Sequence, residues 1–439
     1  MCGFVLTSNT PEHRVPAALE AMSYRGADGK MGVVSRGFFT LGHVRLAIQD
    51  LSDESRQPKA YPGFDLAFVG EVFNAPDGVM EIDHIANTLV KLGPQGFHGF
   101  DGFWAIASVF REIAYIYTDH LGIKPVYYWP TKGIVCSELE PMFALEDRPP
   151  LDEIYLANCI KFGYDYSGRT PYKGIFQVPP GHRLEVYLGG MRVTPYWDWS
   201  LVRTPEVTAS NLRWLLDRAI TRRLKGLREI GLLLSGGLDS SIIYYSLKAQ
   251  GLLDLVHCLS VENGESEFLP YGVKALPVSP VSNEEAARIM QAPLDLGSLL
   301  PQIQLARALK AQGLNVCLTG DGADELFGGY HRSKVYDSQA SDVFCELPYY
   351  HLPRLDRVMM RETVEQRSPF LAPSVVAFAL KTPRVFRTGK LILKNAYCDL
   401  LPTDILMRDK HPLKSTAAQT GIPYRTNLVE DFRNVTASA

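Results

Sequence analysis

A short apolar stretch that runs directly into a glycine turn constrains the fold of this chain more than any other feature. Residues 230–234 (IGLLL) are followed by residues 235–241 (SGGLDSS). An unbroken apolar run of this length is typical of a strand buried on both faces of a parallel sheet. The two glycines let the backbone approach an anion, and a helix expected over 242–248 would point its N-terminal amides at negative charge. The pattern predicts a strand, turn and helix that bind the pyrophosphate of a nucleotide.

Asp239 in this turn would lie beside the phosphates, where a carboxylate is unfavourable unless a divalent cation separates them. An ordinary turn between a strand and a helix is the alternative, and it would be the better interpretation of Ser-Gly-Gly alone. The strand, the acid, the serine pair and the helix together favour a nucleotide site. We expect the following residues to contact ATP: Leu232, Ser235, Gly236, Gly237, Asp239, Ser240, Ser241 and, from a second turn, Gly320.

The second turn follows another apolar stretch, residues 314–319, and reads GDGADELFGGY over residues 320–330. Parallel sheets bind ligands at the carboxyl ends of their strands, so both turns would face one crevice. Asp239 and Asp324 are then expected to hold one Mg²⁺ between them. A solvated acidic loop is the alternative, and the glycine spacing argues against it.

These two turns resemble the synthetase half of the glutamine-dependent asparagine synthetases, which belong to the PP-loop ATP pyrophosphatases. Three later segments match that family in the same order: residues 364–371 (VEQRSPFL), 389–394 and 408–410. The resemblance implies that ATP adenylates a carboxylate and that ammonia then attacks the acyl-adenylate. The expected cofactors are therefore ATP and Mg²⁺.

The resemblance also assigns roles to residues in these segments. Glu365 would accept a proton during the attack of ammonia, and Lys410 would stabilise charge at the reacting centre. Asp321 and Arg367 would lie in the pocket for the acceptor and its adenylate. For Glu365 the alternative is an ion pair with Arg367 or another neighbour.

The N-terminus resembles the glutaminase half of the same family. Met1-Cys2-Gly3-Phe4 matches the start of an N-terminal-nucleophile glutaminase, in which loss of the methionine leaves Cys2 with a thiol and a free α-amine. An α-amine has a pKa of about 8, so at neutral pH enough of it is unprotonated to activate the thiol. A buried, inert cysteine is the alternative, and it is the commoner case for a cysteine without such a context.

Four further segments match this half: residues 24–28, 43–50, 70–74 and 119–125. The resemblance implies that Arg45 binds the glutamine carboxylate and that Gly70 and Glu71 also contact glutamine. Residues 82–85 stand where the family has S-D-x-E, so Asp83 is expected to bind the α-amine of glutamine.

One position departs from the family pattern. The family has an asparagine that donates to the oxyanion directly before its Gly-Glu, and here that position is Val69. Loss of one such donor costs on the order of 10²–10³ in turnover in other enzymes. We therefore expect slow glutamine hydrolysis unless another donor has replaced the asparagine.

Composition narrows the class of protein. A chain of 439 residues, 46% of them hydrophobic, can bury two sizeable cores. The net charge of −3 does not favour nucleic acid or anionic lipid as a partner. The sequence has no apolar stretch of membrane-spanning length and no visible signal peptide, which predicts a cytoplasmic protein. Its seven cysteines are scattered, which predicts reduced thiols. The expected partners are small molecules: glutamine or ammonia, ATP and a carboxylate acceptor. Whether the chain also forms a homodimer stays open.

The chain divides into two parts by pattern. Short alternating segments such as residues 114–118 favour two antiparallel sheets between helices, and strands that alternate with helices then favour a parallel sheet. The expected fold is an αββα N-terminal-nucleophile glutaminase domain over 2–195, followed by an α/β PP-loop ATP pyrophosphatase domain over 205–439. A helix is expected from about Ser210, its N-cap, whereas residues 261–293 show no clear helical pattern.

The combined motifs predict an ATP-dependent amidotransferase of the asparagine synthetase type with aspartate as the acceptor. Asparagine synthetases carry glutamate at the position of Asp321, whereas the related β-lactam-forming synthetases carry tyrosine there and usually lack Cys2. An acid together with Cys2 favours amide formation. Two alternatives stay open: a specialised carboxylate from natural-product, sugar or peptide modification, and a nucleotide-binding regulator without catalysis.

Overall fold

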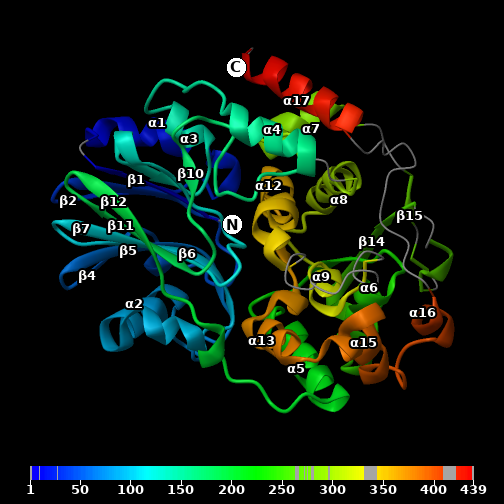
Figure 1. The fold of residues 1–439 in the computed structure, drawn as a ribbon. Coiled ribbons are helices and arrows are strands. Elements are labelled where there is room, and N and C mark those ends of the chain that lie inside the picture. The colour runs from blue at the N-terminus through cyan, green and yellow to red at the C-terminus, as the bar shows by residue number, and fades with distance from the viewer. Residues whose placement is uncertain are drawn as a thin grey trace.

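The computed structural model describes residues 2–8, 10–26, 28–262, 266–270, 272–273, 275–277, 281–294, 297–330, 344–408 and 422–437. Its N-terminal half contains two six-stranded antiparallel sheets that stack face to face, and its C-terminal half contains a five-stranded parallel sheet (Figure 1). Both sheet types were expected in this order. No helix in the described ranges has the length and apolar character needed to cross a membrane.

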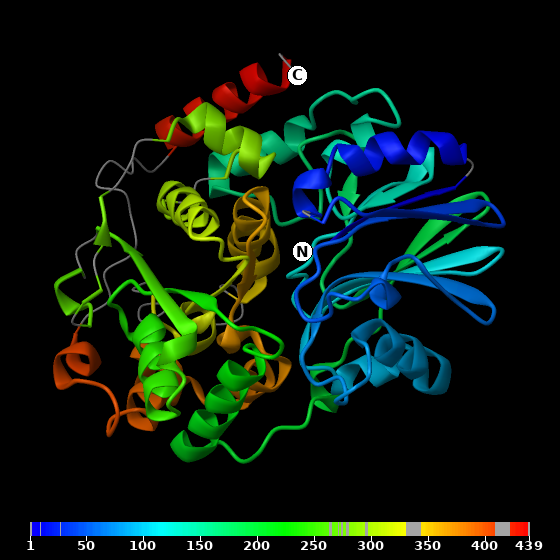
Figure 2. The same cartoon turned by 180° about the vertical axis from the view of Figure 1, so that it is seen from behind.

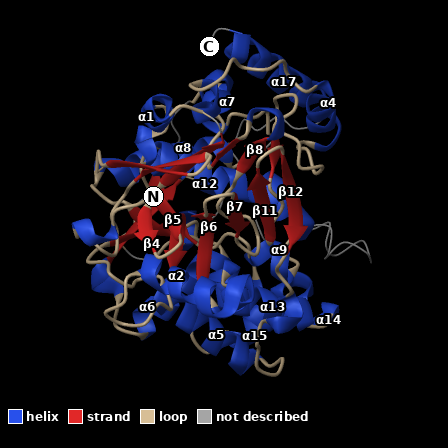
Figure 3. Ribbon diagram, turned by 90° about the vertical axis from the view of Figure 1, so that its left-hand side faces the viewer, coloured by secondary structure: helices blue, strands red, loops and turns tan. Residues whose placement is uncertain are grey.

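The two stacked sheets form the middle layers of an αββα sandwich. The order of the first is β10 (Phe176–Gln177), β8 (Tyr127–Trp129), β9 (Ile134–Cys136), β1 (Gly3–Ser8), β3 (Phe39–Val44) and β2 (Met31–Arg36). The order of the second is β12 (Gly190–Pro195), β11 (His182–Tyr187), β7 (Ile113–Thr118), β6 (Gly102–Val109), β5 (Phe64–Val72) and β4 (Lys59–Tyr61). Helix α1 (Val15–Glu20) covers the first sheet, α2 (Glu81–Leu92) covers the second, and Figure 3 shows the strands between helices.

Alternating side chains explain why these two sheets stack. Residues i and i+2 of a strand share one face, and Phe4 and Leu6 of β1 enter the same core as Ala67 and Val69 of β5. Each of these four side chains is fully buried. The core places β1, and with it the N-terminal cysteine, in the centre of the sandwich.

The parallel sheet brings the two glycine turns together. Its order is β15 (Ala275–Leu276), β14 (Val256–Val261), β13 (Ile230–Leu233), β16 (Val316–Leu318) and β17 (Glu365–Arg367), and all its pairs are parallel. The two turns follow the parallel strands β13 and β16, as predicted, and these two strands are adjacent in the sheet. The surrounding helices are α5 (Ala209–Arg222), α6 (Leu238–Ala249), α8 (Leu299–Ala311), α12 (Leu352–Arg361) and α13 (Pro373–Lys381).

Three expectations about helices need correction. Helix α5 begins at Ala209, because the Thr208 hydroxyl caps it by accepting from the amide of Asn211 at 3.1 Å. Helix α6 begins at Leu238 and not at 242, since the amides of the turn itself form its first turn. Within the region expected to lack helix, α7 spans Asn283–Met290 and is capped by Ser282, which stands three residues before Glu285.

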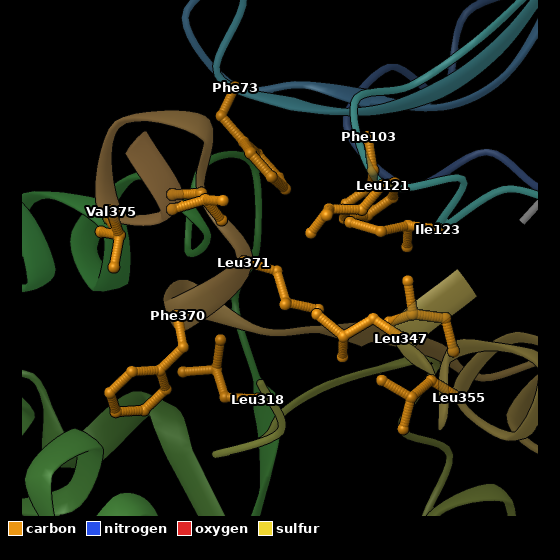
Figure 4. Packing of buried hydrophobic residues seen from close by; sticks show 14 of the residues in the cluster. Phe73, Phe103, Leu121, Ile123, Leu318, Leu347, Leu355, Phe370, Leu371 and Val375 are labelled. Atoms are coloured by element: carbon orange, nitrogen blue, oxygen red, sulfur yellow. The ribbon is translucent and has the colours of Figure 1, made fainter. Parts of the chain in front are cut away.

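The two halves share a continuous hydrophobic core. Phe73, Phe103 and Leu121 from the N-terminal half belong to the same buried cluster as Leu355 and Leu371 from the C-terminal half (Figure 4). The C-terminal helix α17 (Ile422–Ala437) adds a second contact, because it packs on α7 and on α4 (Glu153–Phe162) of the N-terminal half (Figure 2). The halves are therefore joined by packing as well as by the chain.

Candidate active sites

Cys2 lies at the start of β1, on the wall of a cavity of about 350 Å³. The cavity is enclosed by residues 45–50, by β5 and by the segment that leads into α2. The Cys2 thiol points to the carbonyl oxygen of Leu46, 3.9 Å from its Sγ. Burial raises the pKa of the thiol, and the carboxylates of Glu71 and Glu365 raise it further. A thiol in this setting needs a base to become a nucleophile.

Arg45 presents a buried positive charge to this cavity. Its guanidinium donates to the carbonyl oxygens of Ser52 (2.8 Å) and Asp50 (2.5 Å) and to the hydroxyl of Ser55 (2.6 Å). These three acceptors are neutral, so they orient the guanidinium without neutralising it. The arrangement suits a substrate carboxylate.

Gly70 brings backbone close to the same cavity. Its φ is +126°, and a Cβ atom at this position would lie 2.0 Å from the carbonyl oxygen of Phe103. The strand therefore requires glycine here. The preceding residue, Val69, is fully buried in the sandwich core and offers no hydrogen-bond donor.

Two glutamates of the N-terminal half line the cavity, Glu71 and Glu81. Gln49 donates to both carboxylates, at 3.3 Å to Glu81, and the amide of Val72 donates to Glu81 at 2.5 Å. Burial raises the pKa of Glu71 well above its usual value, with a contribution from Glu365. Burial likewise raises the pKa of Glu81 to about 7. A cationic group of a substrate would restore both to the charged form.

Asp83, the expected anchor of the glutamine amine, does not line this cavity. Its carboxylate is bound by Lys59 Nζ at 2.8 Å and by the Tyr61 hydroxyl at 2.5 Å. Glu81, two residues earlier, lines the cavity instead. Residues 80–83 (MEID) carry two acids with the spacing of S-D-x-E, so the sequence also fits a match two residues earlier than the one expected.

Glu365 of β17 reaches the cavity from the C-terminal half. It is fully buried, and its carboxylate accepts from Arg367 Nε at 2.6 Å. A terminal nitrogen of Arg367 also lies 3.5 Å from a Glu71 carboxylate oxygen. The ion pair considered as the alternative for Glu365 is therefore present, and the further contact of Arg367 with Glu71 bridges the two halves. Arg367 lies between two acids, and its expected place in the pocket of Asp321 stays a prediction.

The Ser-Gly-Gly turn has an internal hydrogen-bond frame. The amide of Gly237 donates to the Ser235 hydroxyl at 3.1 Å, and the amide of Ser235 donates to the Ser240 hydroxyl at 3.2 Å. Gly236 has a φ of +86°, and Gly237 is the N-cap of α6. The turn thus leads into the N-terminus of α6, a helix of twelve residues, and the free backbone amides there suit a phosphate group.

The second turn packs tightly against the first. A Cβ atom on Gly320 would lie 2.8 Å from the Cβ of Asp239, so only glycine permits this approach. Leu232 pairs with Leu318 in the sheet beneath, and Ser241 is buried in the first turn of α6. Most residues expected to contact ATP therefore lie around one edge of the parallel sheet.

Asp239 and Asp324 lie close enough to share one cation. The ammonium of Lys390 is 2.5 Å from an oxygen of Asp239 and 2.6 Å from an oxygen of Asp324. A single positive charge thus already occupies the space between the acids, and Mg²⁺ fits the same donor set. Among the described residues no group of three metal-ligating side chains occurs, and Mg²⁺ commonly takes one or two carboxylates plus phosphate oxygens. The sequence analysis matched residues 389–394 to the family but did not assign Lys390 to the site.

Neighbouring polar side chains hold the carboxylate of Asp321. It accepts from Arg354 at 2.6 Å and from the Gln366 side chain at 2.7 Å. Burial raises the pKa of Asp321, but Arg354 and a hydrogen bond with the Thr319 side chain together outweigh burial, and the pKa falls below its usual value. Lys410 lies outside the described residues, whereas Arg408 donates to the carbonyl oxygen of Gly236 at 2.5 Å.

Comparisons with known families agree with the two-part site. A model described as a glutamine amidotransferase domain matches residues 1–197, and a model described as asparagine synthase matches residues 211–348 and 332–435. The chain belongs to the asparagine synthase family. With both domains present, it is a glutamine amidotransferase of the asparagine synthetase type.

Three relatives show the range of the asparagine synthase family. A probable glutamine-hydrolysing asparagine synthetase of Acanthamoeba polyphaga mimivirus is 24% identical over 93% of this chain and 83% of its own. Glutamine-hydrolysing asparagine synthetase 3 of Bacillus subtilis is 24% identical over 90% of this chain and 83% of its own. A protein of Penicillium rubens named amidase chyE is 26% identical over 77% of this chain and 58% of its own.

Proposed function

We propose that this amidotransferase adenylates a carboxylate, with aspartate as the first candidate, and converts it to an amide with ammonia from glutamine. The products would be the amide, glutamate, AMP and pyrophosphate. One observation carries the proposal: Cys2 and Glu365, from different halves of the chain, line the same cavity. Ammonia released at Cys2 would therefore form beside a residue of the synthetase domain.

In the glutaminase reaction, Arg45 would bind the glutamine carboxylate, and Glu71 with Glu81 would bind its ammonium group. The Cys2 thiol would give its proton to the free α-amine and attack the side-chain amide, which releases ammonia and leaves a thioester. Water would then hydrolyse the thioester to glutamate. The amide of Gly70 is the donor proposed for the oxyanion, because Val69 cannot donate.

In the synthetase reaction, the amides of the 235–241 turn and of α6 would bind the phosphates of ATP. Asp239 and Asp324 would hold Mg²⁺, which offsets the charge of the departing pyrophosphate. A carboxylate oxygen of the acceptor would attack the α-phosphorus, and Lys410 is proposed to stabilise the charge there. Ammonia would then attack the acyl carbon, with Glu365 accepting a proton.

A second candidate acceptor is a carboxylate other than aspartate. The relative named as an amidase favours it, and so does the pairing of Asp321 with Arg354, which presents a neutralised acid to the acceptor. The two acceptor classes share every earlier step. We further propose the domain boundaries 2–195 and 205–439, and small molecules as the only substrates.

Exchange of labelled pyrophosphate into ATP, measured with a panel of carboxylic acids, tests the proposal. Exchange that depends on one acid would identify the acceptor, and aspartate is expected to support it first. Asp239→Asn should abolish exchange while the thermal unfolding midpoint stays near that of the unmodified protein. ADP as the stoichiometric product would overturn the proposal, because the chain would then cleave the other phosphate bond.

A further inference from the structure

Helix α12 lies near the middle of the molecule, beside the N-terminal half (Figure 1), and its charged side chains contact both halves. Arg354 and Asp356 are two residues apart on this helix, and both are buried. Residues two positions apart in an α-helix are separated by roughly 200° around its axis. One helix can therefore contact the acceptor pocket on one side and the glutaminase domain on the other.

Asp356 binds the glutaminase domain through two cations. Its oxygens accept from the two terminal nitrogens of Arg25 at 2.9 and 3.2 Å, and from Lys124 Nζ at 2.6 Å. Asp356 and Arg25 are both almost fully shielded from solvent, and the two cations hold the pKa of Asp356 well below its usual range despite burial. A fork of two parallel hydrogen bonds fixes the plane of the guanidinium as well as its position.

The same guanidinium holds the backbone of the nucleophile. Arg25 Nε donates to the carbonyl oxygen of Cys2 at 3.1 Å, while Arg25 also pairs with Glu138 of its own domain. The carboxylate of α12 thus orients Arg25, and Arg25 in turn orients Cys2. The chain of contacts crosses 331 positions of sequence between Arg25 and Asp356.

The other side of α12 contacts the acceptor pocket. Arg354 donates to Asp321 at 2.6 Å and to the Ser298 hydroxyl at 2.8 Å. Any movement of Asp321 when the acceptor binds would act on Arg354, and through the rigid helix on Asp356. Coupling between two sites requires a physical element that both sites bias, and α12 is such an element.

We propose that Asp356 is a positioning residue for Cys2, and that α12 ties this positioning to the occupancy of the acceptor pocket. The proposal rests on the proposed function for the location of the acceptor. Burial of these charges is costly, and apolar side chains would have sufficed to join the halves, as they do in Figure 4. The charges provide what apolar packing cannot, namely a directed contact to the Cys2 carbonyl.

Asp356→Asn in the full chain tests the proposal. Turnover for glutamine hydrolysis should fall by about tenfold to a hundredfold, the scale of a small misplacement of a reacting group. The KM for glutamine should stay within about twofold, because Arg45 and Glu81 are not in contact with Asp356. Synthesis from added ammonium should be retained, and the ratio of glutaminase rates with and without ATP and acceptor should move from above one toward one.

Two other variants keep the test decisive. Arg25→Lys retains a positive charge for Asp356 but removes the Nε donor to Cys2, so it should show the same loss of turnover even if Asp356→Asn does not fold. Arg433→Gln is the matched control, because it breaks an exposed pair between the halves, Arg433 with Glu153 at 3.0 Å, away from α12. It should change none of these rates.

Equal loss of glutamine-dependent and ammonium-dependent synthesis in both Asp356→Asn and Arg25→Lys would overturn the proposal and show a merely structural role. Unchanged turnover in both would also overturn it. Glutamate release and covalent labelling of Cys2 by a diazoketone analogue of glutamine do not require an acceptor. These two readouts therefore test the positioning of Cys2 even if no acid in the panel supports exchange, which would count against the proposed function alone.

Discussion

The ammonium of Lys390 lies 2.5 Å from a carboxylate oxygen of Asp239. The Lys390 backbone has a φ of +61°, a conformation that costs a non-glycine residue free energy, and the side chain is buried. The fold thus places a cation between the two acids proposed to bind Mg²⁺. Metal and lysine would compete for this space, and Lys390 would move toward the phosphates when Mg²⁺ binds with ATP.

Replacement of Lys390 should make this competition measurable. Lys390→Met removes the positive charge that contacts Asp239 and Asp324, so the free energy of unfolding without Mg²⁺ should fall by roughly 3 kcal/mol. Added MgCl₂ should then raise the unfolding midpoint of the variant more than that of the unmodified protein. Lys381→Met, which loses only a surface contact with Thr204, is the control. A variant that Mg²⁺ does not stabilise would show that the two acids are not a cation site.

Glu81 and Asp83 should respond differently to removal of their charge. Glu81→Gln should raise the KM for glutamine by about tenfold to a hundredfold, because a charge-assisted contact to the substrate ammonium is lost. Asp83→Asn should leave the KM near its original value, since Asp83 is bound by Lys59 and Tyr61. Steady-state glutamate release measures both, and the opposite order of effects would restore Asp83 as the anchor.

The pKa of Glu81, raised by burial to about 7, predicts how pH acts on glutamine binding. The carboxylate is charged above pH 7 and neutral below, so the affinity for glutamine should fall as pH drops through 7. The effect on stability has the opposite sign. An acid whose pKa is raised in the folded state favours folding at low pH, and this contribution is lost as pH rises from the usual pKa of glutamate to about 7. A profile of kcat/KM that is flat near pH 7, or unchanged in Glu81→Gln, would contradict this.

Cys2→Ala should separate the two nitrogen sources. Synthesis from glutamine should be lost, while synthesis from ammonium should remain, because the proposed nucleotide site does not include Cys2. Product formation with each source, at saturating ATP and acceptor, measures the difference. If both sources fail equally while the protein remains folded, Cys2 has a structural role and not the one proposed.

Val69→Asn is the boldest substitution. Its amide would add a donor beside the backbone amide of Gly70, so glutamate release should rise by up to about two orders of magnitude. Because Val69 is fully buried among apolar side chains, the same change should lower the unfolding midpoint. Brisk hydrolysis by the unmodified enzyme, unchanged in the variant, would mean that another group already serves the oxyanion.

The sequence predicted the elements whose chemistry is local. The meeting of Asp239 with Asp324 was expected from two motifs that each combine a strand with a turn, whereas the adjacency of β13 and β16 was not predicted. The helix α7 was also readable, since Ser282 and Glu285 form a capping signal that we did not use. Local patterns of this kind require no knowledge of distant partners.

Contacts between distant segments could not be predicted from sequence patterns. The approach of Glu365 to the cavity of Cys2, and the insertion of Lys390 between two acids, depend on how separate elements pack. The sequence could not separate Asp83 from Glu81, because two acids two positions apart fit one motif in either register. Only the direction of each side chain, set by the start of α2 at Glu81, separates the two readings.

The shared core of Phe73, Phe103, Leu121, Leu355 and Leu371 has a consequence for engineering. A glutaminase half taken from a relative and fused to this synthetase half would meet an apolar surface shaped for other side chains. Either half produced alone would expose that surface to water and tend to aggregate. Successful chimeras should therefore exchange the apolar residues on both sides of the seam together, and bring with them the matching Arg25 and Asp356.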